Sequence, residues 1–151
     1  MCNNQNEGNC ISETLKVICI LQQNACPENC LDSCDRPMLG GGNNCLICNT
    51  RPVMLYTCCG NGVPLSMPTS KDSSATCSTP SVDSSCEGCS NVFRVEKIEG
   101  NCCTFRVLAL NPDQTCCNNV PYISTNSFFT MNLDCCCIVR CLNDCYVDCV
   151  C

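Results

Sequence analysis

Cysteine is the residue whose number and spacing could do chemistry in this chain. There are 24 cysteines in 151 residues, and no histidine or tryptophan. Thiols join as disulfides, or hold metal ions as thiolates. This density is typical of a disulfide scaffold, in which each bond stabilises the fold by roughly 2–4 kcal/mol. Because aromatic residues make up only 5% of the chain, we expect sulfur to supplement a modest core.

Groups of adjacent cysteines indicate in which directions the thiol side chains point. Four such groups occur: Cys58-Cys59, Cys102-Cys103, Cys116-Cys117 and Cys135-Cys136-Cys137. Adjacent Cα atoms lie about 3.8 Å apart, closer than the roughly 4.4–6.8 Å of a relaxed disulfide. Adjacent cysteines therefore need separate partners, and on a strand they point to opposite faces. This pattern favours bonds between subunits, unless another sheet of the same chain covers the outward thiols.

Two CxxC units offer a metal site as the alternative. Cys45, Cys48, Cys86 and Cys89 could supply four thiolates to one structural zinc ion. However, the two units are far apart, and the second lies in a low-complexity stretch. We therefore predict no cofactor, with zinc as the alternative.

Composition argues against several other classes of protein. Without histidine there is no Ser–His or Cys–His pair, so we predict that the chain is not an enzyme. Its net charge is −6 and its eight Lys and Arg residues are scattered, which disfavours nucleic acid and anionic membranes as partners. No apolar run approaches the ~18 residues of a membrane span, and the start does not resemble a signal peptide.

These features pose a question of compartment, since disulfides are rare in the cytosol. Three interpretations remain open. The chain binds metal, it is the mature form of an exported disulfide-rich binding protein, or it is made reduced and oxidised later.

The elements that must position the thiols centre on residues 128–142, predicted as one long β-strand. One face is apolar or sulfur-bearing: Phe129, Met131, Leu133, Cys135, Cys137, Val139 and Cys141. The other is mixed and includes Cys136, so Cys136 is predicted to point outward. A helix is the competing interpretation, because Cys137, Cys141 and Cys145 recur every four residues, but residues 128–137 lack strong helix formers.

One helix is predicted, over residues 11–23. Ser12 is placed to cap it, and the inward stripe is formed by Leu15, Ile18, Cys19 and Gln22.

Further strands are predicted over residues 51–59 and in a hairpin over 92–111, with reversals at 60–62 and 99–101. The predicted fold is therefore mainly β, an antiparallel sandwich or barrel, with one short N-terminal helix. We expect a flexible arm over 1–10, a single domain over 11–142 with a Ser/Thr-rich loop at 66–91, and a cysteine-bearing tail over 143–151.

Three segments together resemble the spore coat protein Y/Z family of endospore-forming bacteria. The first runs from Cys10 through a short helix to CPENC at 26–30. The second is FRVEK at 93–97 followed by Cys102-Cys103, and the third is LDCCCIVRCL at 133–142. The resemblance spans nearly the whole chain.

This resemblance implies a structural protein of the spore coat or exosporium. It would be made in the mother-cell cytoplasm without a signal peptide and laid on the forespore with other coat proteins. There it would assemble with itself into hexameric or higher two-dimensional arrays that later become locked by disulfides. The compartment question is then answered by reduced synthesis and late oxidation.

We assign the cysteines on this basis, since termini and loops are where subunits can touch. Those predicted to bond between subunits are Cys2, Cys10, Cys77, Cys86, Cys89, Cys136, Cys149 and Cys151. Those predicted to bond internally are Cys26, Cys30, Cys102, Cys103, Cys135, Cys137 and Cys141.

Overall fold

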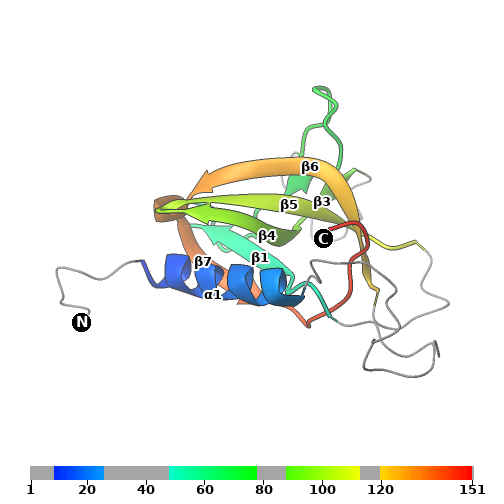
Figure 1. Ribbon diagram of the computed structural model, residues 1–151. Helices are drawn as coiled ribbons and strands as arrows, with labels where there is room; N and C mark the ends of the chain where they lie inside the picture. Colours follow the sequence, from blue (N-terminus) through cyan, green and yellow to red (C-terminus); the bar gives the residue numbers. More distant parts are fainter. Residues whose placement is uncertain (1–8, 26–47, 78–87, 113–119, 151) are drawn as a thin grey trace, which may run out of the picture.

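The predicted N-terminal helix is present as α1 (Cys10–Ala25), which lies along one side of a β-sheet (Figure 1). The computed structural model describes residues 9–25, 48–77, 88–112 and 120–150. The inward side of α1 carries the predicted stripe, and the buried residues are Ser12, Leu15, Ile18, Cys19 and Gln22. The predicted cap is wrong. The side-chain oxygen of Asn9 accepts from the Ile11 amide at 3.1 Å, whereas the Ser12 hydroxyl donates to the Gly100 carbonyl at 3.2 Å.

A five-stranded sheet forms the body of the molecule and confirms the mainly antiparallel β fold class. Its order is β6-β5-β4-β1-β7. The strands are β1 (Val53–Thr57), β4 (Val92–Glu99), β5 (Cys102–Leu110), β6 (Tyr122–Asn132) and β7 (Cys136–Cys141). The two edge strands, β6 and β7, follow each other in the chain. The sheet must therefore curl until its edges meet at one end, which makes it barrel-like there; β6 arches over the other strands (Figure 1).

The predicted single strand over 128–142 is wrong, because a 3₁₀ turn, η1 (Leu133–Cys135), divides it. The side chain of Asn132 accepts from the Asp134 amide at 3.0 Å, which ends β6 and starts the turn. The alternation of faces is lost in these three residues. As a result Cys136 points into the core and is 4% exposed, while Cys135 is exposed.

The predicted hairpin is confirmed in β4 and β5, which pair from Val92–Leu108 to Glu99–Cys102. Gly100 in the connecting turn has φ +57°, a conformation that favours glycine. At the far side of β5, β6 pairs antiparallel from Cys102–Asn132 to Leu110–Tyr122.

The core lies between α1 and the concave side of the sheet. Its centre is aromatic: the Phe93 and Phe129 rings meet edge-on at 4.8 Å, and the Phe105 and Phe129 rings stack at 5.2 Å. Leu15 and Ile18 of α1 belong to the same buried cluster. Burial of these side chains is the main force that holds the helix on the sheet.

Part of the predicted loop at 66–91 is ordered as a small two-stranded sheet. Here β2 (Met67–Pro68) pairs antiparallel with β3 (Cys89–Ser90). The predicted reversal at 60–62 precedes it, with positive φ at Asn61 and Gly62. Residues 78–87 of the loop lie outside the described residues.

The segment after β7 packs back onto the body of the molecule. Cys145 pairs with Thr50 in an isolated antiparallel bridge, and Val147 is fully buried beside Val92. The Asn49 side chain holds this segment by donating to the Val147 carbonyl at 2.8 Å and accepting from its amide at 2.9 Å.

Candidate functional site

Exposed thiols gather at the end of the sheet where β6 turns into β7. They come from four separate segments and are Cys10, Cys59, Cys102 and Cys135; we call them the first thiol pole. Hydrogen bonds bring these segments together: Leu133 donates to the Asn101 carbonyl at 2.8 Å, and Cys58 donates to the Cys135 carbonyl at 3.1 Å. The side chain of Asn9, next to Cys10, donates to the Leu133 carbonyl at 3.2 Å. Local folding therefore presents four thiols on one end of the molecule.

Further exposed thiols lie towards the opposite end of the sheet. Cys141 ends β7 and pairs with Val53, and Cys149 follows the Cys145–Val147 segment that packs there. We call these two residues the second thiol pole. Figure 1 shows the separation of the two ends: the orange-brown turn between β6 and β7 lies at the left, and the red C-terminal segment at the right.

Two disulfides are present among the described residues, and one corrects the cysteine assignment. Cys77 and Cys89 were each predicted to reach another subunit, but they bond to each other across 12 residues, with Cα atoms 6.0 Å apart. The β2–β3 pairing brings Cys89 back to the start of the loop. Cys58 bonds to Cys137 with a Cα separation of 5.1 Å, so Cys137 lies in an internal bond in this structure.

Other assigned cysteines occupy different surroundings from those predicted. Cys136, predicted to be outward, is buried by the change of face at η1. Cys102, Cys135 and Cys141, predicted to bond internally, are exposed and unbonded, whereas Cys103 is fully buried and also unbonded. The remaining assigned residues Cys2, Cys26, Cys30, Cys86 and Cys151 lie outside the described residues.

Several exposed thiols were missed in the sequence or placed on the wrong face. Cys59 directly precedes the Gly60-Asn61-Gly62 reversal, a position where the chain leaves the sheet. That turn signal could have marked Cys59 as outward.

The buried thiols form a separate, protected group beneath the first thiol pole. Burial raises the pKa of Cys103 to about 12, and the nearby Cys19 and Cys136 add to this rise. Burial also raises the pKa of Cys19 and of Cys136. Since the thiolate is the reactive form, the raised pKa lowers the reactivity of each of these three thiols.

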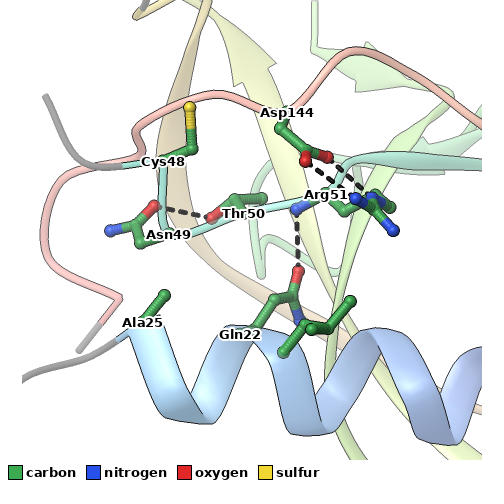
Figure 2. Close-up of a pocket in the computed structure, with 8 residues that line it drawn as sticks. Gln22, Ala25, Cys48, Asn49, Thr50, Arg51 and Asp144 are labelled. Atoms are coloured by element: carbon green, nitrogen blue, oxygen red, sulfur yellow. Dashed lines mark hydrogen bonds and ion pairs between the residues drawn. The ribbon is translucent and has the colours of Figure 1, made fainter.

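A small cavity of about 50 Å³ lies between the end of α1 and the strand leading into β1 (Figure 2). Arg51 lines it and forms a two-point ion pair with Asp144, at 2.7 and 2.8 Å. The hydrogen bond from Arg51 lowers the pKa of Asp144. Gln22 accepts from the Arg51 amide at 3.1 Å. These polar groups satisfy one another, so the cavity is best described as a clamp between helix, strand and C-terminal segment.

The alternative zinc site is contradicted at one of its four ligands. Cys89 is consumed by the disulfide with Cys77 and cannot serve as a thiolate. Cys48 lies at the clamp (Figure 2), and the other two ligands fall outside the described residues. No group of three or more Cys, Asp, Glu or His side chains is arranged to hold a metal ion within the described ranges.

Among the described residues, none of the helical structure is long and apolar enough to cross a membrane.

The family model for spore coat protein Z matches residues 1–144. No curated protein and no solved structure matches the chain. With almost its whole length covered, including the helix, the sheet and the first thiol pole, the chain belongs to the spore coat protein Z family.

Proposed function

We propose that this chain assembles with itself into an ordered two-dimensional layer of the spore coat or exosporium, hexameric or higher in order, and that disulfides between subunits lock the layer. Its family gives the chain a structural role in the spore coat at the spore surface. The observation that carries the finer proposal is the placement of unbonded thiols on two exposed ends of a fold that already has internal disulfides.

Non-covalent contacts would come first, and α1 offers a surface for them. Val17, Ile20 and Leu21 lie on its outward side and are 56, 55 and 47% exposed. This i, i+3, i+4 spacing makes one apolar stripe, and such stripes mark association sites. The occupant we propose is a second copy of the chain, because only 15% of residues are charged and a weakly charged surface tends to associate.

Oxidation would follow assembly. Repeated matching contacts place the same thiols of neighbouring copies together. Once formed, unstrained disulfides resist reduction. A chain made reduced in the mother cell and oxidised on the spore would therefore end as a covalent shell, in which other coat proteins could also be joined.

The proposal is tested by electron microscopy of the purified protein before and after exposure to air. We expect ordered sheets that dissolve in detergent while reduced, and that withstand detergent after oxidation until reductant is added. Protein alkylated under native conditions is the matched control, since it should form sheets that never become detergent-resistant. A monomer that persists under air, with every thiol paired internally or bound to stoichiometric zinc, would overturn the proposal.

A further inference from the structure

We propose that copies of this chain join head to tail, with the η1 turn of one copy seated in a groove at the other end of the next, and that Cys135 and Cys141 form the disulfide between them. This inference rests on the proposed function and adds a second contact between copies to the one made by α1. Three observations support the inference: the groove at one end of β7, the opposite charges at its two ends, and the distance between the thiols at those ends.

The groove lies at the second thiol pole, between the start of β6 and the end of β7. Its volume is about 530 Å³, and its lining includes Tyr122, Arg140, Cys141 and Asp144. Asp144 is already paired with Arg51. The groove therefore offers an unbonded thiol beside a cation.

Arg140 and Lys71 are the two described cations without a carboxylate partner, and the Lys71 ammonium lies over the Phe128 ring. Within the described residues, Lys16, Arg51, Arg94, Lys97 and Arg106 all pair with carboxylates. Arg140 is exposed, and its guanidinium donates to the sulfur of Met54 at 3.9 Å. In a chain of net charge −6, a cation without a carboxylate partner favours a contact with an acidic group of a second copy.

The η1 turn supplies the complementary group. Asp134 and Cys135 are adjacent and exposed at the tip of the turn, and the Asp134 carboxylate has no ion-pair partner among the described residues. Seating the turn in the groove of the next copy brings Asp134 to Arg140 and Cys135 to Cys141. A contact between two first poles would instead oppose two Asp134 carboxylates, which repel.

The length of β7 excludes this bond within one chain. Cys141 is six positions after Cys135 in the chain, which is about 20 Å along a strand. A disulfide requires Cα atoms within roughly 7 Å. Because β7 holds the two thiols apart, they can pair only between copies. One copy then has a donor end and an acceptor end, and repetition extends the assembly into a ring or an open array.

The bond forms by oxidation of the two thiols with dioxygen. Each thiol gives up one proton and one electron, the two sulfur atoms join, and dioxygen is reduced to hydrogen peroxide. Both thiols are exposed, so the oxidant and the partner copy can reach them.

Complementation between two variants tests the pairing. The protein is assembled, oxidised in air and digested without reductant, and the Cys135–Cys141 cross-linked peptide is measured by mass spectrometry. We expect it in the wild type and expect it to vanish in Cys135→Ser and in Cys141→Ser. An equimolar mixture of the two variants should restore it, at about a quarter to a half of the wild-type yield, because each supplies the thiol that the other lacks. Ser73→Ala, an exposed change in the loop near β2 and outside both thiol poles, is the matched control and should leave the yield unchanged.

Charge reversal tests the docking independently of the thiols. Asp134→Arg should reduce the yield of this peptide at low salt by about tenfold, and Asp134→Arg combined with Arg140→Asp should restore it. Asp72→Arg, an exposed change in the loop near β2, should have no effect. If the sheets form and subunits are cross-linked but the mixture yields no Cys135–Cys141 peptide, the head-to-tail contact is wrong while self-assembly stands. If the wild type forms no inter-subunit bond, the proposed function fails as well.

Discussion

The thiols of this protein fall into two groups, buried and exposed, that differ in their surroundings. Cys19, Cys103 and Cys136 are enclosed by the core, where removal from water favours the neutral thiol. By contrast, Cys102 and Cys135, which are the neighbours of Cys103 and Cys136 in the sequence, are exposed. Adjacent cysteines such as Cys102 and Cys103 therefore have different surroundings: Cys103 fills the core, and Cys102 is available at the surface.

Alkylation at pH 8 should separate the two groups. Iodoacetamide should modify Cys102 and Cys135 in the native protein within minutes, and should leave Cys103 unmodified until the chain unfolds. The reason is that burial raises the pKa of Cys103 to about 12, so its thiolate is scarce. Mass spectrometry of protein alkylated with and without denaturant measures this, and rapid native labelling of Cys103 would contradict it.

The same shift predicts a loss of stability at high pH. The pKa of Cys103 in the folded protein lies above its ordinary value of 9.0. The contribution of the protonated Cys103 thiol to the free energy of unfolding is therefore complete below about pH 9, and it is lost as pH rises towards about 12. Denaturant unfolding between pH 7 and 10.5, with exposed thiols alkylated, should show a falling free energy of unfolding above pH 9. Cys103→Ala should show a shallower fall.

A buried charge network makes Glu96 another critical residue. Its carboxylate pairs with Arg94 at 3.1 Å and with Arg106 at 2.8 Å, and the Arg94 side chain is only 5% exposed. Glu96→Gln would leave two guanidinium groups without their counter-charge, and we expect a loss of about 3 kcal/mol in the free energy of unfolding. Glu99→Gln is the matched control: its pair with Lys97 is exposed and should contribute less than about 0.5 kcal/mol. Equal losses in the two variants would contradict this account.

At the scale of elements, the Cys58–Cys137 disulfide ties β1 to the edge strand β7 across 79 residues. Cys58→Ser should lower the free energy of unfolding by about 2–4 kcal/mol without reductant, and Cys58→Ser with Cys137→Ser should cost no more than the single change. Cys59→Ser, one residue away and exposed, should behave as wild type. A wild type whose stability is unaffected by reductant would argue against this bond.

The elements also show what the sequence could and could not predict. The helix and the hairpin over 92–111 were predictable, because their apolar periodicity and the Gly100 turn act locally. The division of 128–142 was missed because alternation continues on both sides of η1. Only Asn132, whose side chain accepts from the Asp134 amide, signals the turn. That single capping bond decides which of Cys135 and Cys136 faces water.

The pairing of cysteines was less accessible to sequence, since it depends on contacts between distant segments. Cys77 and Cys89 lie in a stretch without periodicity, and only the β2–β3 pairing brings them together. Likewise, the thiols of the first thiol pole come from segments at or next to α1, β1, β5 and η1. No local sequence pattern indicates that these segments lie together. Disulfide chemistry could be predicted from the cysteine content, whereas the positions of the individual thiols could be learned only from the fold.

At the scale of the whole molecule, internal disulfides and exposed thiols have different roles. The internal bonds and the aromatic core define one subunit, and the two thiol poles lie at opposite ends of its sheet. A subunit with reactive groups at both ends can be joined on two sides, as an extended layer requires.

The most direct test of this account is disulfide mapping on mixed isotopes. Reduced protein labelled with ¹⁵N is combined with an equal amount of unlabelled protein, allowed to assemble, oxidised in air, quenched with acid and digested without reductant. If disulfides lock neighbouring subunits, cross-linked peptides will include pairs that carry one labelled and one unlabelled partner, at about half of all inter-subunit links, while Cys58–Cys137 and Cys77–Cys89 remain uniformly labelled. If every disulfide-linked pair is uniformly labelled, all bonds lie within single chains and the covalent layer does not exist.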